Sequence, residues 1–376
     1  MGGLAHGLEL AGAKHAAFVE LNKDACQSLR NNFDEKIVHH MDVKDFDFNS
    51  ISNVDIIAGG PPCQPFSLGG KHEGFNDDRD MFPYAAKAVR LLSPKAFIFE
   101  NVKGLLRDSF SEYFKYIIAR LTYPSFEIKK NESWESHYGR LITLNYDSFL
   151  GLKYHIKFKL LNAADYGIPQ IRERVVIVGI RNDHGNDWEF PIETHSQKAL
   201  EWLMRNDFSY WKRHGISKAL AQKHMLFMEK RSRAADAPYG FLAPDSLPWL
   251  TVRDAIGDLP DPQTSHNLPD HKYQPGAKAY PGHTGSDLDW PSKTIKAGGH
   301  GVPGGENMLR LLDGSYRYLT ILETKRIQTF PDSYIIKGAW GEAMRQIGNA
   351  VPVKLGRVIG ESVFDYLSKT ETRKAV

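Results

Sequence analysis

Short apolar runs alternate with longer amphipathic stretches over the first half of the chain, and this alternation restricts the possible folds more than any other feature. It is typical of βα units built around a mostly parallel sheet. We therefore expect a Rossmann-like, doubly wound α/β domain over residues 1–183. Strands are predicted at 15–20, 37–40, 54–59, 96–100, 154–161 and 175–179, and helices at 23–32, 81–92 and 112–121.

Polar residues follow several of these predicted strands directly. Glu20 ends the first strand, Asp42 follows the second, a glycine-rich loop follows Gly59, and Glu100 ends the fourth strand. In open α/β sheets the ligand crevice lies outside the carboxyl ends of the strands. We therefore expect these groups to converge on one candidate active site.

The rest of the chain is organised differently. Residues 123–150 are polar and aromatic without clean periodicity, and we interpret them as a surface insertion. Glycines and prolines crowd residues 257–314, so residues 184–319 are predicted to form a second, smaller, loop-rich domain. Helical patterns at 320–328 and 353–367 indicate that residues 320–376 return to the first domain.

One segment of the second region is basic with interleaved aromatic residues, which fits either a solvated helix face or a nucleic-acid contact. It comprises Trp202, Arg205, Tyr210, Trp211, Lys212, Arg213, Lys218, Lys223, Lys230, Arg231 and Arg233.

Composition excludes several classes of protein. Hydrophobic residues make up 41% of the chain, too many for a disordered protein, and no apolar run reaches the length of a membrane helix. The two cysteines, Cys26 and Cys63, are too few for a disulfide framework or a thiolate zinc site. We expect a cytoplasmic protein with no membrane partner and no metal. The net charge of +3 permits a polyanionic partner without requiring one.

A proline-rich loop at 59–67 places one thiol in a fixed position. Pro61, Pro62 and Pro65 flank Cys63 and exclude a helix, so the loop must project rigidly from the end of the strand at 54–59. The alternative is a surface turn with an incidental buried cysteine. A desolvated carboxyl at Glu100 could serve as a proton donor, although a lone glutamate at a strand end is often a helix cap or ion-pair partner.

A third polar cluster occurs at 170–174. Arg172 and Arg174 are separated by one residue in an extended segment, so both side chains should lie on the same side. Two guanidinium groups there could bind phosphate or a carbonyl oxygen, although this pattern is also common in surface ion-pair clusters.

Taken together, these segments resemble the C5-cytosine DNA methyltransferases of the bacterial modification type, over nearly the whole chain and in the family's motif order. The resemblance rests on residues 61–64, 100–102, 170–174 and 346–352, with further similarity at 251–260, 290–295 and 323–332. It implies an S-adenosylmethionine-dependent methyltransferase fold, with target recognition in residues 184–319. The implied partner is double-stranded DNA, bound by a bacterial monomer, with a possible cognate restriction endonuclease.

The resemblance also implies a role for each catalytic residue. Cys63 attacks C6 of a cytosine flipped out of the duplex, and Glu100 protonates N3. Arg174 holds O2 of the base, and Arg172 supports the loop or a phosphate. The activated C5 then accepts the methyl group of S-adenosylmethionine, and residues 68–79 form the lid.

The cofactor residues implied by the resemblance are Gly2, Gly3, Glu20, Asp42, Val43, Pro62, Met81, Asn349 and Val351. Family members precede the two glycines with a strand, an acidic residue, an aromatic residue and a further glycine, so the sequence opens in the middle of the first cofactor motif. We expect the missing strand to reflect an upstream start or a shortened chain, or else a natural fragment. The chain as given should then be less stable and should bind the cofactor weakly.

Two functions therefore remain open from the sequence: a sequence-specific DNA methyltransferase, and a weakly active or inactive DNA-binding remnant. A transfer-RNA methyltransferase of the same superfamily is disfavoured, because neither cysteine is followed by Phe-Thr. A thiol hydrolase built on Cys63 would need a paired histidine. The residues of the second region do not specify which DNA sequence would be recognised.

Overall fold

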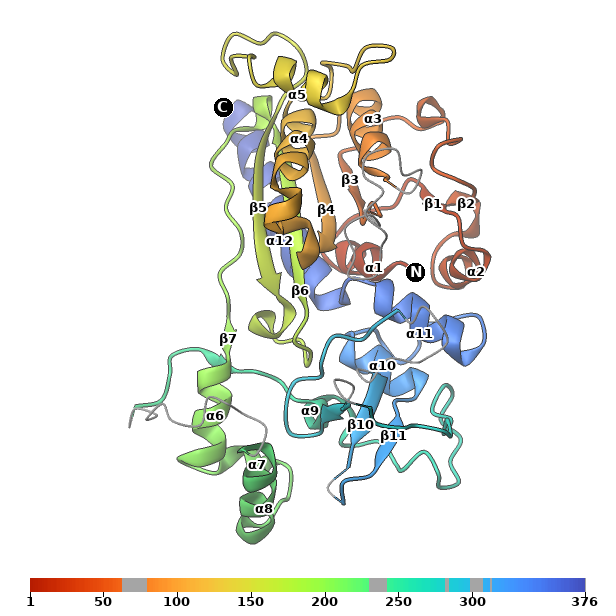
Figure 1. The fold of residues 1–376 in the computed structure, drawn as a ribbon, viewed down its shortest axis with the longest axis vertical. Helices are drawn as coiled ribbons and strands as arrows, with labels where there is room; N and C mark the ends of the chain where they lie inside the picture. The colour runs from red at the N-terminus through yellow and green to blue at the C-terminus, as the bar shows by residue number, and fades with distance from the viewer. Residues whose placement is uncertain (63–79, 230–241, 281–283, 298–306, 312, 376) are drawn as a thin grey trace.

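The computed structural model describes residues 1–62, 80–229, 242–280, 284–297, 307–311 and 313–375. Its first region is a doubly wound α/β fold, as expected, with helices on both faces of a central sheet (Figure 1). The elements of this region are α1 (Gly3–Leu10), β1 (Phe18–Glu20), α2 (Lys23–Asn32), β2 (Val38–His40), β3 (Ile56–Gly59), α3 (Phe82–Leu92), β4 (Ala96–Val102), α4 (Ser111–Thr122), α5 (Trp134–Leu141), β5 (Tyr154–Asn162) and β6 (Glu173–Arg181).

The central sheet has the strand order β3-β4-β6-β5. Strands β3 and β4 are parallel, whereas β6 runs antiparallel to both of its neighbours. Alternate residues of β4 point to opposite faces: Phe97 and Phe99 pack with α3 and α4, while Ala96 and Ile98 pack with α12 (Val353–Ala375). Because both of its faces are covered, β4 begins with a continuous apolar run in the sequence.

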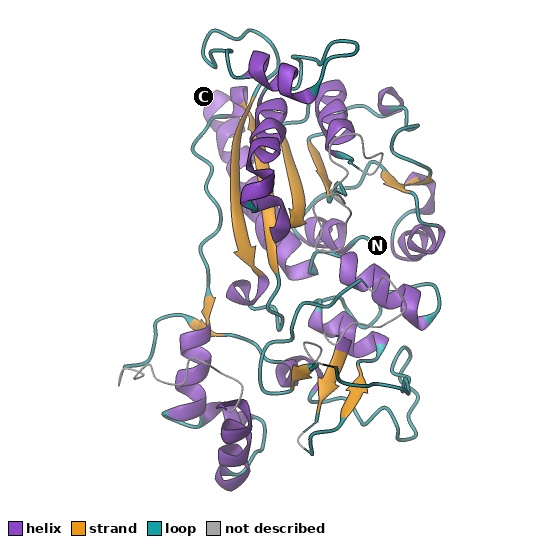
Figure 2. Cartoon of the chain, viewed as in Figure 1, coloured by secondary structure: helices purple, strands orange, loops and turns teal. Residues whose placement is uncertain are grey.

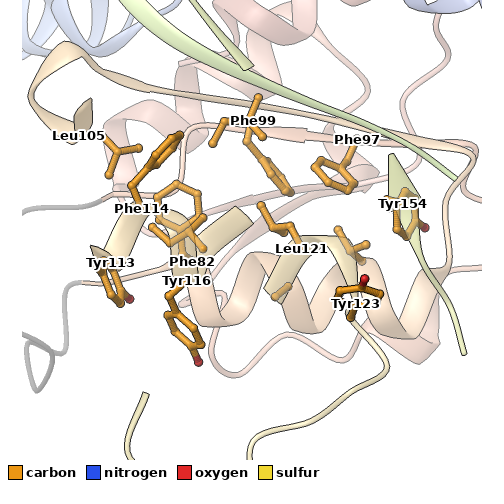
Figure 3. Close-up of a cluster of buried hydrophobic side chains, with 14 of the residues drawn as sticks. Phe82, Phe97, Phe99, Leu105, Tyr113, Phe114, Tyr116, Leu121, Tyr123 and Tyr154 are labelled. Carbon is orange, nitrogen blue, oxygen red and sulfur yellow. The ribbon is translucent and has the colours of Figure 1, made fainter. Parts of the chain in front are cut away.

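Aromatic side chains dominate the core on the α3 and α4 face. Figure 3 shows Phe97 and Phe99 of β4 facing Phe114 and Leu121 of α4, with Tyr154 of β5 at one end of the cluster. The rings of Phe97 and Phe99 stack with centroids 5.0 Å apart. This packing fixes β4, and therefore the position of Glu100 at its end.

Strands β1 and β2 pair with each other in a separate parallel sheet, next to α2. A cluster of side chains connects this pair to the central sheet: Phe46 and Phe48 pack with Val19 of β1, Ile57 of β3 and Ala88 of α3. The two sheets are therefore held together by side-chain packing, and no backbone ladder joins them among the described residues.

The insertion at 123–150 contains one helix that the sequence analysis did not predict. Ser133 caps α5 by accepting from the Ser136 backbone N–H, and α5 packs on α4. His137 is fully buried in α5, where its ring nitrogens lie 3.1 Å from the Tyr116 hydroxyl and 3.0 Å from the Phe126 carbonyl. A buried histidine looks polar in a sequence pattern, so the apolar stripe of this short helix was missed.

The second region lies below the central sheet in Figures 1 and 2 and has two parts. One is helical and packs around Tyr210 and Trp211. The other surrounds a three-stranded sheet of order β11-β10-β9. Its elements are β7 (His195–Ser196), α6 (Gln197–Arg205), α7 (Ser209–Arg213), α8 (Lys218–Glu229), β8 (Leu247–Pro248), α9 (Val252–Ile256), β9 (Ser286–Asp287), β10 (Met308–Arg310) and β11 (Tyr316–Tyr318). The helices α10 (Ile321–Ile327) and α11 (Trp340–Asn349) follow this region in the chain.

The C-terminal helices connect the two regions. Ile327 of α10 and Ile347 of α11 share a core with Val252 and Leu309 of the second region, whereas α12 packs on the central sheet through Leu355 and other residues. Residues from α10 to the start of α12 therefore form the junction between the regions. None of the helices in the described part of the chain combines the length and apolarity needed to span a membrane.

Candidate active site at the carboxyl edge of the sheet

Glu100 and Arg174 form a partly buried ion pair at the carboxyl end of β4. Because β4 and β6 are antiparallel, Glu100 lies opposite Val176, and Arg174 is its diagonal neighbour on the same face. The Arg174 Nε lies 2.6 Å from Glu100 Oε1, and Glu100 is only 9% exposed. Sequence positions 100 and 174, predicted separately, are thus brought into direct contact. The pair places a carboxylate and a hydrogen-bond donor at one point of the crevice.

The proline-rich loop begins beside this ion pair. A Cβ atom built on Gly60 would lie 3.2 Å from Glu100 Oε2, so the loop passes against the carboxylate. The Asn101 side-chain amide donates to the Pro61 carbonyl at 3.0 Å, and the Met81 backbone N–H donates to the Pro62 carbonyl at 3.1 Å. The base of the loop is therefore fixed to β4 on one side and to α3 on the other.

Cys63 follows Pro62 directly, and it lies outside the described residues, as do the predicted lid residues 68–79. The described structure thus holds the attachment of the predicted nucleophile but not the nucleophile itself. Asn101, which anchors Pro61, lies in the segment 100–102 noted above, but the sequence analysis gave it no role. Two features of the sequence could have indicated one: Asn101 directly follows the acid at the strand end, and the prolines of the loop lack N–H groups that could pair with nearby carbonyls.

Arg172 lies in the interior, unlike Arg174. Its side chain is 1% exposed, and its guanidinium donates to the Ile295 carbonyl at 3.1 Å and to the Gly348 carbonyl at 2.8 Å. Burial, together with the neighbouring positive charge of Arg174, lowers the pKa of Arg172 to about 9. Of the two roles expected for Arg172, support of a loop fits this arrangement. A phosphate contact does not, because the guanidinium presents almost no surface to solvent.

Of the two cofactor glycines, Gly3 packs against Val351, another predicted cofactor residue. Gly2 adopts a left-handed conformation with φ 83° as the N-cap of α1. A Cβ atom on Gly3 would lie 2.2 Å from the Val351 carbonyl, so only glycine permits this approach. Asn349, at the end of α11, is exposed. The structure thus brings together Gly3 and Val351, which are 348 positions apart in the sequence.

Two carboxylates lie at the ends of the separate two-stranded sheet. Glu20 Oε1 accepts from the Asn22 backbone N–H at 2.9 Å, which fixes the carboxylate at the start of α2. Asp42 Oδ1 accepts from the Lys44 backbone N–H at 2.9 Å. Carboxylates at strand ends of such a fold suit ribose hydroxyls and amino groups. Val43 packs in the cluster between the two sheets, and Met81 is the N-cap of α3.

These residues fit an adenosyl group with a methionine tail. The acidic oxygens supply acceptors, and Gly3 packs closely on the Val351 carbonyl and on the Phe330 and Ala350 side chains, which makes a tightly packed surface between α1 and the segment after α11. Gln328 supports that surface: its side-chain amide donates to the Ile347 carbonyl at 2.8 Å. Gln328 was not predicted, and its signal was weak because it lies in an ordinary helical pattern.

The basic, aromatic segment of the second region separates into a core and a surface. Tyr210 and Trp211 are fully buried in the helical part, so these aromatic residues are not available to stack on bases. Lys212, Lys218 and Lys223 are exposed, while Lys230, Arg231 and Arg233 lie outside the described residues. The aromatic pattern of the segment therefore reflects packing, and its exposed lysines remain available to a polyanion.

Comparison with known proteins identifies relatives over the full length of the chain. The family model for the C-5 cytosine-specific DNA methylases matches residues 1–131 and 135–365. The type II methyltransferase M.Eco47II of Escherichia coli is 33% identical over 99% of this chain and 78% of its own length. The type II methyltransferase M.NgoMIV of Neisseria gonorrhoeae is 29% identical over 98% of this chain and 96% of its own.

Solved structures share the fold at lower identity. A prophage-encoded protein of E. coli, described as a DNA modification methyltransferase, superposes with a TM-score of 0.57 at 18% identity, over 97% of this chain and 96% of that one. The Dnmt2 methyltransferase of S. pombe superposes with a TM-score of 0.55 at 15% identity, over 98% and 96% of the two chains.

Proposed function

The chain belongs to the C-5 cytosine-specific DNA methylase family, and we propose that it methylates C5 of a flipped-out cytosine, with S-adenosylmethionine as donor, through a covalent bond to Cys63. Family membership makes it a DNA (cytosine-5-)-methyltransferase, which acts on DNA. The observation that carries the finer proposal is the Glu100–Arg174 pair beside the loop that leads into Cys63. A carboxyl group and a guanidinium side by side match the N3 and O2 edge of cytosine.

The donor supplies an electrophilic methyl group on a sulfonium when it is bound. Glu20 would accept from the ribose hydroxyls, and Asp42 and Val43 would contact the adenine. Met81 would lie against the adenine ring, and Asn349 and Val351 would close over the methionine portion. Gly2, Gly3 and Pro62 would complete the cofactor site. This assignment is supported by the close packing of Gly3 on Val351 and by the two carboxylates at strand ends.

Cytosine C5 is a poor nucleophile until the ring is made electron-rich. The Cys63 thiolate bonds to C6, and the electron density released into the ring is met by a proton from Glu100 at N3. Arg174, which pairs with Glu100 before DNA arrives, donates to O2. Glu100 therefore has to take up a proton as the base enters the pocket.

With C5 made nucleophilic by Cys63 and Glu100, methyl transfer would form a bond from C5 to the methyl carbon and break the bond from that carbon to the sulfonium sulfur. A base or water removes the C5 proton, the bond from Cys63 to C6 breaks, and the proton on N3 returns to Glu100. The products are 5-methylcytosine and the demethylated donor.

C6 is hidden in stacked duplex DNA, so the target base must leave the helix to reach this pocket. The second region, residues 184–319, would recognise the surrounding sequence, and its exposed lysines would contact phosphates. We expect a monomeric, cytoplasmic bacterial enzyme, with a cognate restriction endonuclease as a possible partner.

A weakly active DNA-binding protein is the alternative, and one observation favours it. The cofactor carboxylates Glu20 and Asp42 lie at the ends of the two-stranded sheet, and within the described residues this sheet joins the sheet that carries Glu100 by side-chain packing and by no backbone ladder. A cofactor site divided between two sheets would bind its ligand weakly while leaving the second region intact.

The deciding experiment combines methyl transfer with covalent trapping. Unmethylated plasmid DNA and labelled S-adenosylmethionine should yield labelled 5-methylcytosine, and duplex containing 5-fluorocytosine should trap the protein. Cys63→Ser should abolish both results and retain DNA binding, because the thiolate is needed only for the covalent step. Cys26→Ala is the matched control, because Cys26 is buried in a separate cluster. Trapping of the Cys63→Ser protein would contradict the mechanism, and DNA binding without transfer by the wild type would support the alternative.

A further inference from the structure

Three segments that are distant in the sequence meet around the buried side chains of Gln170 and Arg172. They are residues 169–172 before β6, residues 292–297 of the second region, and residues 347–351 at the end of α11. We propose that Gln170 and Arg172 are positioning residues that couple the second region to the cofactor segment, so that DNA and cofactor bind cooperatively. This inference rests on the proposed function, which assigns DNA to the second region and the cofactor to residues 349 and 351.

The second region is attached to the segment 169–172 by a short backbone ladder. The Ile171 N–H donates to the Ser292 carbonyl at 2.8 Å, and the Ser292 N–H donates to the Pro169 carbonyl at 2.9 Å. The Thr294 hydroxyl donates to the Ile171 carbonyl at 2.9 Å. Two side chains then complete the attachment at Ile295: its N–H donates to Gln170 Oε1 at 3.0 Å, and its carbonyl accepts from Arg172. Residues 292–295 therefore move with the start of β6.

The same guanidinium attaches the cofactor segment. Arg172 Nη2 donates to the Gly348 carbonyl at 2.8 Å, one residue before Asn349. Gly348 also packs directly on the second region, because a Cβ atom there would lie 2.4 Å from the Ala297 nitrogen. Arg172 is thus the one side chain in the described structure that is hydrogen-bonded to both segments at once. Its fork of nitrogen donors reaches two carbonyls, which a single ammonium on lysine could not do at the same geometry.

The energetics make this junction responsive to both ligands. The Arg172 charge is buried with two carbonyls as its hydrogen-bond partners, and its Nε and the Gln170 Nε2 are buried without a hydrogen-bond partner among the described residues. A buried cation with incomplete hydrogen bonding depends strongly on the few partners it has. Small shifts of the Ile295 or Gly348 carbonyl therefore change the free energy of the buried Arg172 charge. A ligand that fixes residues 292–297 therefore reduces the cost of ordering residues 347–351, and the reverse holds by linkage.

One partner of the catalytic pair, Arg174, lies at the start of β6, directly after the segment that holds Arg172. Arg174 follows Arg172 by two residues and contacts Glu100, so displacement of the start of β6 would also move the donor that faces the base. Arg172 is buried, and its side-chain hydrogen bonds in the described structure go to Ile295 and Gly348 rather than to Glu100. It therefore acts on the site through its neighbours.

The test measures binding of S-adenosylhomocysteine, an unreactive product analogue, with and without saturating sheared unmethylated plasmid DNA. For the wild type we expect DNA to lower the dissociation constant by about fivefold or more, a typical coupling between linked sites. In Arg172→Lys the ratio of the dissociation constant without DNA to that with DNA should fall towards one. Arg181→Lys is the matched control. Like Arg172, Arg181 donates to a backbone carbonyl, and it also pairs with Asp183, but it lies at the opposite end of β6. This control substitution should lower stability without changing the ratio.

A measurement on the wild type keeps the test valid if Arg172→Lys fails to fold. Hydrogen exchange of the Ile295 amide, which Gln170 holds, should slow when the analogue alone is added. Three results would each overturn the proposal. The first is that DNA lowers the dissociation constant of folded Arg172→Lys as much as that of the wild type. The second is that DNA leaves the dissociation constant of the wild type unchanged, and the third is that the analogue leaves the exchange rate of the Ile295 amide unchanged. Failure of the wild type to bind either ligand would instead refute the proposed function.

Discussion

Replacing Glu100 by glutamine tests the site most directly, because it changes the charge of one residue and little of its shape. The Glu100 carboxylate is 9% exposed and lies 2.6 Å from the Arg174 Nε through Oε1, while Oε2 faces Gly60. The amide keeps a carbonyl oxygen that can still accept from Arg174. It loses the negative charge, and it cannot deliver a proton to N3 as a carboxylic acid does.

Two magnitudes follow from this geometry. General acid catalysis contributes roughly 10²- to 10⁴-fold in rate, so methyl transfer should slow by that factor, or about 3 to 5 kcal/mol in activation free energy. Removing one partner of a fully buried ion pair costs about 3–5 kcal/mol. Here the hydrogen bond survives and Arg174 keeps some exposure, so we expect a loss of only about 1–2 kcal/mol in the free energy of unfolding.

The assay is single-turnover methyl transfer, measured beside urea unfolding of the same protein preparation. Glu173→Gln provides the control, because it removes the same charge from β6, the strand that pairs with β4. Its ion pair with Lys103 is largely exposed, with side chains 42% and 60% accessible, and is worth about 0–1 kcal/mol. A Glu100→Gln protein within a few-fold of wild-type turnover would reassign Glu100 to a structural role. If Glu100→Gln slowed methyl transfer but also lost most of its free energy of unfolding, the slower transfer would be explained by misfolding and not by the loss of a proton donor.

Two further predictions concern stability and the cofactor site. Burial, with the nearby charge of Lys354, lowers the pKa of His195 from 6.5 to about 4, so the unfolded chain binds a proton that the folded chain resists. Stability should therefore fall by at most about 3 kcal/mol as the pH drops from 6.5 to 4, and urea unfolding of His195→Gln across that range should show a correspondingly shallower slope. Adding about 12 to 18 residues that form a strand and turn before Met1 should raise both the melting temperature and the affinity for S-adenosylmethionine, because one more strand can join β1 to β3 by backbone hydrogen bonds. Equal values for the two lengths would show that the separated sheets already hold the cofactor site.

Local signals in the sequence determined most of the regular structure in the first region. The helix predicted at 23–32 is α2 with the same bounds, because Asn22 caps it and its apolar stripe is regular. The strand predicted at 96–100 is β4 extended to Val102, and a strand-terminal acid placed Glu100 at the carboxyl edge. Hydrogen bonds to caps and the alternation of side chains act over a few residues, so a single sequence reveals them.

Only the tertiary structure decided how those elements combine at the site. Arg172 and Arg174 look equivalent in the sequence, yet one is buried beneath Ile295 and Gly348 while the other pairs with Glu100. Tyr210 and Trp211 look like a nucleic-acid contact, yet they form a core. Each outcome depends on burial by residues tens to hundreds of positions away. Burial fixes the free energy of a charge or an aromatic ring through all of its neighbours together, and residue type alone does not specify those neighbours.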